Sequence, residues 1–87
     1  MPNTLVVSTF DCPFSEFEAV VKKVDKEQGY VFCSELEIVK VNEHKAMILM
    51  NCSDLEKFGS MLEQPKLKKW DMDNNCVDTV YNLELIQ

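Results

Sequence analysis

The sequence predicts an α+β fold in which strands and helices follow the order β-α-β-β-α-β. Three observations predict it: two segments with helical spacing of apolar residues, four short segments of strand-forming composition, and no linker or repeat between them. The compact arrangement for this order is a four-stranded antiparallel sheet, with spatial order 4-1-3-2 and two helices on one face. We therefore expect a single domain over residues 1–87.

The first strand and the first helix are predicted from residue type and spacing. Residues 4–10 are rich in β-branched and aromatic side chains, which favour a strand. Ser15 is followed three residues later by Glu18, the capping-box pattern of a helix start. The apolar residues that follow have helical spacing, with Gly29 as the expected stop: Phe17, Val20, Val21 and Val24.

A β-hairpin is expected next. Residues 35–41 alternate between apolar and polar, residues 46–50 are an apolar run, and the four residues between them are polar. A tight turn around Glu43 and His44 predicts a hairpin with Val39 opposite Ile48 and Val41 opposite Ala46. His44 is expected to be an exposed turn residue. Residues 30–34, before the hairpin, are not assigned to an element.

The second helical region and the last strand complete the order. Ser53 and Glu56 repeat the capping-box spacing, and Leu55, Phe58 and Leu62 have helical spacing. Pro65 can open a short further helical turn over residues 66–70, followed by a loop over 71–75. Alternation from Val77 to Ile86 predicts the last strand.

Charge and hydropathy each exclude one class of partner. The chain has a net charge of −6, and all nine of its basic residues are lysines. Proteins that bind nucleic acids present a basic face and rely on arginine for bidentate contacts, so we expect no nucleic-acid partner. No stretch is long and apolar enough for a membrane span, and no signal peptide is recognised. We therefore expect a cytoplasmic protein with no membrane partner.

No metal or cofactor is predicted. Cys12, Cys33, Cys52 and Cys76 contain no C-x-x-C pair, and His44 is the only histidine, so zinc-site spacing is missing. The run from Asp71 to Asn75 resembles the start of a calcium loop but lacks the required later Gly and Glu, and is interpreted as a plain acidic loop. The cysteines are expected to be apolar fillers. Cys12 with Cys76, and Cys33 with Cys52, should lie at opposite ends of the sheet, and either pair could be a redox couple.

The pattern as a whole resembles the dimeric α+β barrel superfamily of ferredoxin-like domains. The likeness lies in the strand lengths, the Ser15 capping box, the hairpin, and the proline break of Glu63-Gln64-Pro65-Lys66 before Trp70. The superfamily includes antibiotic-biosynthesis-type monooxygenases and muconolactone-isomerase-like enzymes. The resemblance implies dimers that pack sheet against sheet, a cavity, and enzymatic members that use His, Asn or Trp. It implies no cofactor.

Candidate ligand-binding residues follow from that resemblance, and no catalytic motif is present to assign a catalytic residue. The candidates are Trp70, Tyr81, Asn51 and Asn82. Cys12 is added because a helix N-terminus can lower the pKa of a thiol. Tyr81 is otherwise expected in the core, on the apolar side of its strand.

Both faces of the predicted sheet carry apolar residues, although helices cover only one. The expected grouping places Leu36, Ile38, Met47 and Leu49 on one face, and Val39, Val41, Ala46, Ile48 and Met50 on the other. A homodimer through the helix-free face would bury the excess. Alternatively, segments 30–34 and 66–75 fold over that face in a monomer.

Two functions are carried forward from the sequence. The first is a small homodimeric binding or interaction module for a small, largely apolar molecule. The alternative is a cofactor-independent monooxygenase or isomerase acting in a cavity. A deep closed pocket lined by Tyr81, Trp70 and an Asn would favour the enzyme, and a filled interior without convergent polar groups would favour the module.

Overall fold

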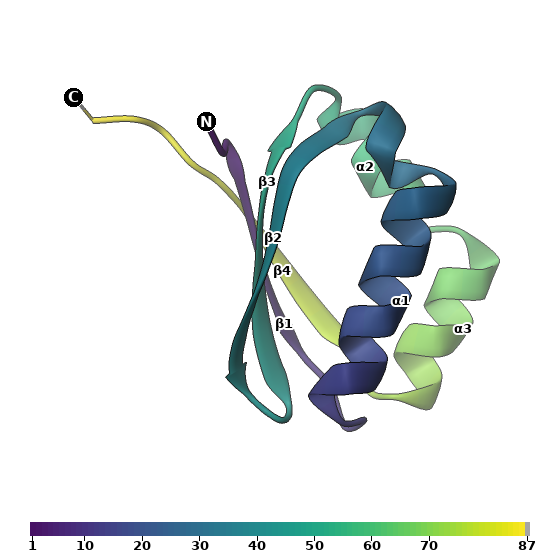
Figure 1. The fold of residues 1–87 in the computed structure, drawn as a ribbon. Helices are drawn as coiled ribbons and strands as arrows, with labels where there is room; N and C mark the ends of the chain where they lie inside the picture. Colours follow the sequence, from purple (N-terminus) through teal and green to yellow (C-terminus); the bar gives the residue numbers. More distant parts are fainter. Residues whose placement is uncertain (87) are drawn as a thin grey trace.

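The computed structural model describes residues 1–86 and contains the predicted elements in the predicted order (Figure 1). Gln87, the last residue of the predicted domain 1–87, lies outside the described residues. The strands are β1 (Thr4–Thr9), β2 (Cys33–Asn42), β3 (Lys45–Cys52) and β4 (Val77–Asn82). The helices are α1 (Phe14–Glu27), α2 (Leu55–Leu62) and α3 (Pro65–Asp73), with a short 3-10 helix, η1 (Gly29–Val31), after α1.

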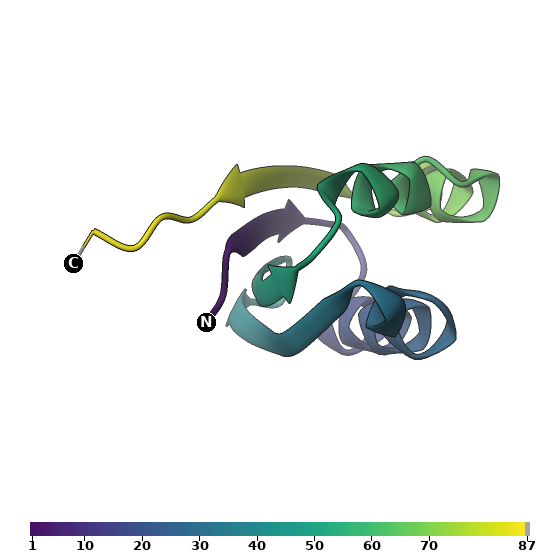
Figure 2. The same ribbon diagram turned by 90° about the horizontal axis from the view of Figure 1, so that it is seen from above.

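The four strands form one antiparallel sheet in the order β2-β3-β1-β4, which confirms the predicted strand order. Figures 1 and 2 show α1, α2 and α3 on the same face of this sheet. The ferredoxin-like α+β fold predicted from the sequence is therefore confirmed. Within residues 1–86, no helix is long and apolar enough to cross a membrane.

The core lies between the sheet and the helix layer. Side chains alternate along a strand, so every second residue of β1 and β3 faces the helices. The rings of Phe10 and Phe17 stack at the start of α1, with centroids 4.2 Å apart. The other buried apolar side chains are Val6, Ala46, Ile48, Met50, Phe58, Met61 and the thiols of Cys12, Cys33 and Cys52.

Both predicted capping boxes are wrong. Helix α1 begins at Phe14 with Pro13 as its N-cap, so Ser15 lies inside the first turn. Proline suits this position because it has no N–H to satisfy and its φ of −62° already fits the start of a helix. At α2 the carboxylate of Asp54 accepts a hydrogen bond from the Lys57 N–H at 3.0 Å. The Ser53 hydroxyl instead donates to the Phe32 carbonyl, just before β2, at 3.2 Å.

The predicted hairpin is present, with its turn at Glu43 and His44, but its register differs from the prediction by one residue. Ile38, and not Val39, lies opposite Ile48. Val39 lies opposite Met47 instead.

A β-bulge causes the shift. Lys40 pairs with Ala46 and Asn42 with Lys45, so Val41 is an extra residue on β2 that the prediction paired with Ala46. A one-residue shift moves side chains to the opposite face of a sheet. Ile38 therefore joins Ala46, Ile48 and Met50 on the helix-facing side, and the predicted grouping of the two faces is wrong.

The helices leave the other face of the sheet uncovered (Figure 2). Segments 30–34 and 66–75 do not fold over this face as the alternative expected, because Cys33, Leu67 and Trp70 line a cavity on the helix-facing side. We call the uncovered side the open face. Its apolar side chains, given by the strand register, are Leu5, Val7, Val39, Met47, Leu49, Val77 and Tyr81.

Three details near the C-terminus differ from the sequence predictions. Helix α3 continues to Asp73, so most of the predicted loop 71–75 is helical. Strand β4 ends at Asn82, and residues 83–86 extend away from the sheet (Figure 1). Tyr81 is not in the core. It is 49% exposed, because it lies opposite Leu5 on the open face.

Candidate functional site

An inner cavity of about 100 Å³ lies between the sheet and the helices. Its walls are mainly apolar and come from every layer of the fold. The sheet contributes Val6, Ile48 and Met50, α1 contributes Phe17, Val20, Val21 and Val24, and α2 and α3 contribute Phe58, Met61 and Leu67. The volume is below the roughly 300 Å³ at which typical drug-sized pockets begin, so the cavity fits a small ligand.

Polar groups converge at one end of the inner cavity. Ser8, Asp71, Cys76 and Asp78 all line it there. Asp71 and Asp78 also line a second, more open hollow of about 370 Å³, which we call the outer groove. The outer groove is completed by Leu62, Glu63, Lys68 and Met72. The two carboxyl groups therefore lie where the inner cavity meets the surface.

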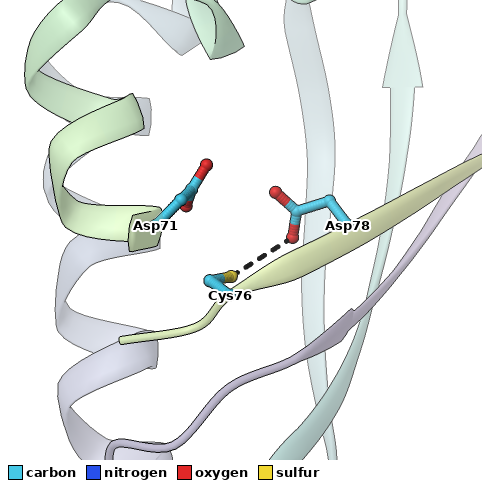
Figure 3. A group of neighbouring side chains, drawn as sticks. All are labelled: Asp71, Cys76 and Asp78. Carbon is cyan, nitrogen blue, oxygen red and sulfur yellow. Dashed lines mark hydrogen bonds between the residues drawn. The ribbon is translucent and has the colours of Figure 1, made fainter. Parts of the chain in front are cut away.

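Asp71, Cys76 and Asp78 form one cluster (Figure 3). Their oxygen and sulfur atoms lie within 4.8 Å of one another. The Ser8 hydroxyl donates a hydrogen bond to Asp78 Oδ1 at 2.5 Å, and the Cys76 thiol donates to the same oxygen at 3.6 Å. Asp78 thus accepts hydrogen bonds from two donors, one on β1 and one in the turn just before β4.

The end of α3 brings this cluster together. The Asn74 side chain caps the helix by donating to the Trp70 carbonyl at 3.0 Å. Asn75 then adopts a left-handed φ of 48°, which reverses the chain and which Asn tolerates better than most residues. The Cys76 N–H consequently donates to the Asp71 carbonyl at 2.8 Å. This turn places the thiol beside the last turn of α3, just before β4 begins.

Burial and like charge shift the ionisation of the cluster. Burial, and then the neighbouring Asp78 carboxylate, raise the pKa of Asp71 above its ordinary value. Burial also raises the pKa of Cys76, with further contributions from Asp78 and Asp71. Cys76 is therefore a protonated hydrogen-bond donor and not a thiolate nucleophile. Asp71 can take up and release a proton closer to neutral pH than an exposed aspartate can.

Among residues 1–86, this cluster is the group whose possible metal-ligating atoms lie close enough together to hold a metal ion. Two carboxylates and one cysteine are ligands that divalent zinc accepts. Binding would require Cys76 to lose its proton, and its raised pKa opposes that loss until a cation arrives. The absence of a metal remains a prediction from the sequence.

One of the five sequence-predicted site residues lines the inner cavity. Trp70 forms part of its wall and packs against Phe17, with ring centroids 6.3 Å apart. Tyr81 lies on the open face, and Asn82 is exposed at the end of β4. Asn51 is half-buried on β3, opposite a residue near the start of β2. Neither Tyr81 nor the two asparagines line the cavity or the outer groove.

Cys12, the fifth predicted residue, is buried and lines neither hollow. Burial, and then the charge of Glu16, raise the pKa of its thiol. The expected lowering by the helix N-terminus is therefore wrong. His44 is an exposed turn residue, as predicted, and its Nδ1 lies 3.2 Å from the Cys12 carbonyl oxygen.

Sequence reasoning missed Ser8, Asp71, Cys76 and Asp78 as a unit. The sequence predicts a loop at Asp71, and nothing in its spacing brings the other three residues together. One signal was present: Asp78 is a charged residue at a helix-facing position of β4, where alternation favours an apolar side chain. The turn that returns Cys76 to α3 depends on a left-handed residue, which spacing alone does not reveal.

Comparison with known proteins identifies the fold. No protein-family model and no curated protein matches the chain. Among solved structures, SnoaB from Streptomyces nogalater, a cofactor-independent oxygenase, is 12% identical with a TM-score of 0.61. The match covers 98% of this chain and 96% of SnoaB. This chain shares its fold with a cofactor-independent oxygenase.

A second solved structure supports the same conclusion. Protein SO0527 from Shewanella oneidensis is 12% identical with a TM-score of 0.50, and the match covers 94% of this chain and 91% of SO0527. These likenesses confirm the ferredoxin-like α+β fold that the resemblance to the dimeric α+β barrel superfamily implied. At this identity they carry no residue roles from one chain to the other.

Proposed function

We propose that this chain binds a small, largely apolar molecule in the inner cavity, with the polar group of that molecule against Ser8, Asp71 and Asp78. One observation carries the proposal: apolar side chains make up most of the walls, and Ser8, Asp71, Cys76 and Asp78 converge at one end, with Asp25 of α1 as the other charged side chain of the lining. Such asymmetry orients a ligand, because burial of the apolar part of the ligand is favourable and one polar group of the ligand can form a hydrogen bond at the polar end. A fully packed interior would have favoured a pure interaction module.

The chemistry of the polar end limits the ligand. Asp78 Oδ1 already accepts two hydrogen bonds, from Ser8 and Cys76, and Asp71 lies across the gap from it. Carboxylates accept hydrogen bonds, so the ligand should bring a hydroxyl, an N–H group or a cation. A ligand carboxylate or phosphate would meet like charge and is disfavoured.

We propose further that the protein is a cytoplasmic homodimer joined through the open face. Seven apolar side chains of the open face, including Val39 and Tyr81 at 41% and 49% exposure, lie on adjacent strands without a helix above them. Soluble monomers rarely leave a contiguous apolar patch of this kind uncovered. Residues 83–86, which extend away from the sheet, add the exposed side chains of Leu85 and Ile86. A second copy of the sheet would bury the open face.

An enzymatic function is the second candidate, and the raised pKa of Asp71 favours it. A carboxyl group with a raised pKa is a stronger base when it is ionised, so it can remove a proton from a bound substrate and return it. Proton removal is a first step common to an isomerase and a cofactor-independent monooxygenase. The cavity contains Trp70 but neither Tyr81 nor an asparagine, so the residues expected for the enzyme are replaced here by aspartates.

Thermal-shift screening tests the binding proposal. A panel of small phenols, amines, alcohols and ketones should contain compounds that raise the unfolding midpoint, because a ligand of the native state stabilises it. Val20→Phe would fill the cavity from α1 and should abolish the shift. Val31→Phe makes the same change at an exposed residue of η1 and should leave it intact. Compounds that shift both variants equally would place binding outside the cavity.

The same compounds separate binding from catalysis. Each compound that binds is incubated with protein in D₂O, and deuterium incorporation at carbon is followed by NMR. In parallel, oxygen consumption is measured with an electrode. An isomerase or oxygenase should lose these signals in Asp71→Asn while retaining the thermal shift. Binding without either signal, in wild type as well as in the variant, would leave the binding module as the function.

A further inference from the structure

Cys33 and Cys52 lie directly opposite each other at one end of the β2–β3 ladder. The backbone of Cys52 is bonded to Asn3, on the β1 side: its N–H donates to Asn3 Oδ1 and its carbonyl accepts from Asn3 Nδ2, both at 2.8 Å. At the next position along the ladder, the Ser53 N–H donates to the Phe32 carbonyl at 2.8 Å. Cys33 and Cys52 are therefore a non-hydrogen-bonded pair.

This kind of pair has the spacing that a disulfide needs. In an antiparallel sheet, the Cα atoms of a non-hydrogen-bonded pair are about 4.5 Å apart, the closer of the two cross-strand spacings. Disulfides join Cα atoms roughly 4.4–6.8 Å apart. Both thiols are free, and both side chains are buried, at 8% and 4% exposure. A bond between them would need little movement of either strand.

We propose that Cys33 and Cys52 form a redox-sensitive dithiol that closes into a buried cross-strand disulfide when hydrogen peroxide reaches it. The proposal does not depend on the identity of any ligand in the inner cavity. It does affect that cavity, because Cys33 lines it. Oxidation would also tie the start of β2 to the end of β3.

The reaction is a two-electron oxidation in two steps. The thiolate of one cysteine attacks a peroxide oxygen: a sulfur–oxygen bond forms, the oxygen–oxygen bond breaks, and the hydroxide that leaves takes up a proton as water. The second thiolate then attacks the sulfenic sulfur: the sulfur–sulfur bond forms and a second water leaves. Overall, the dithiol loses two electrons and two protons, and one peroxide becomes two waters.

The burial of Cys33 and Cys52 favours oxidation by a small oxidant, and the positions of the other two cysteines favour a disulfide within this pair. Burial, then the neighbouring Cys52, raise the pKa of Cys33 to about 12, so thiolate is scarce at neutral pH and oxidation should be slow and faster at alkaline pH. Peroxide is uncharged and small enough to enter where a bulky disulfide reagent is not. Cys76 is instead held by Asp78, and Cys12 pairs with no other cysteine in the strand register.

Peptide mapping after peroxide treatment tests the proposal. Wild-type protein is treated with hydrogen peroxide at pH 7 and pH 9, quenched in acid and digested without reductant. Mass spectrometry should find one linked peptide pair, Cys33 with Cys52, formed faster at pH 9. The oxidised protein should unfold at a higher temperature than the reduced protein, and dithiothreitol should reverse both changes.

Variants separate this pair from general cysteine oxidation. The double variant Cys12→Ser, Cys76→Ser should form the same disulfide. Cys52→Ser should leave a sulfenic acid at Cys33 that dimedone traps, and Cys33→Ser should do the same at Cys52. The peptide map of the wild-type protein decides the question by itself, so the test does not depend on whether every variant folds. Further oxidation of Cys33 to sulfinic acid without a link, or oxidation of Cys12 or Cys76 alone, would overturn the proposal.

Discussion

Ile38 of β2 lies directly opposite Ile48 of β3, and both side chains face the helices. This pairing determines the face that each neighbouring residue of the hairpin occupies, because side chains alternate along both strands. Val39 and Met47 are thereby turned to the open face, next to Leu49. The apolar patch available to a partner is thus a consequence of hairpin register, and the bulge at Val41 sets that register.

The first prediction concerns assembly through the open face. Wild-type protein at tens of micromolar should have twice the 10.1 kDa mass of the chain by light scattering. Leu49→Glu places a charge in the centre of the open face and should give the single-chain mass, because burying an unpaired carboxylate between two apolar sheets is costly. Val31→Glu makes a similar change at an exposed site on η1 and should remain dimeric. A wild-type mass near 10.1 kDa would defeat the proposal.

Much of the fold could be predicted because its elements have strong local signals. The spacing of Phe17, Val20, Val21 and Val24 indicates a helix regardless of its surroundings, and the polar break at residues 42–45 indicates a turn. Strand order followed from the sequence of elements. Helix starts were less predictable, since Ser53 and Asp54 are both good caps and only the backbone geometry decides between them.

The candidate site could be predicted only in part. Trp70 was identified because its aromatic ring and its position after Pro65 stand out locally. The Asp71, Cys76 and Asp78 cluster depends on a left-handed Asn75 and on the pairing of β4 with β1, which brings Ser8 to Asp78 across 70 positions of sequence. Contacts between residues so far apart in the sequence produce no periodic pattern of residue types that could predict them. Tyr81 was misplaced because alternation gives two faces without saying which is covered.

The second prediction tests the N-cap of α2. Asp54→Ala removes the side chain that accepts the Lys57 N–H hydrogen bond and should lower the free energy of unfolding by about 0.5–2 kcal/mol. Ser53→Ala removes only an exposed hydroxyl and should cost less. Urea denaturation of both variants at one protein concentration measures the difference. A larger loss for Ser53→Ala would restore the capping box predicted from the sequence.

The third prediction concerns the hydrogen bond between Ser8 and Asp78. Ser8→Ala removes a fully buried hydroxyl that donates to a carboxylate, and hydrogen bonds to charged groups contribute about 1.5–3 kcal/mol. We expect a loss of stability in that range by urea denaturation. Thr9→Ala, at the next and exposed position of β1, should change stability by less than about 0.5 kcal/mol. Equal losses for the two variants would mean that the Ser8–Asp78 hydrogen bond contributes no stability of its own.

The fourth prediction is a pH dependence that comes from Asp71. Its pKa is raised in the folded protein above the ordinary 3.8, by burial and then by Asp78. Folding therefore favours the protonated form. The stability that this gives is fully present below pH 3.8 and is lost as the pH rises through the raised pKa. Asp71→Asn cannot ionise, so its free energy of unfolding should increase relative to wild type as the pH rises from 3.5 to 7.

The matched control for this prediction is Asp73→Asn, two residues further along α3. Asp73 is exposed and forms only a surface ion pair with Lys69 at 2.9 Å, so its loss should cost less than about 1 kcal/mol at neutral pH. The free energy of unfolding of Asp73→Asn should not increase relative to wild type as the pH rises. Denaturation curves for the three proteins across this pH range decide the question. A difference between Asp71→Asn and wild type that stays constant with pH would mean that Asp71 ionises in the folded protein as an exposed aspartate does, and would remove the support for proton transfer at this site.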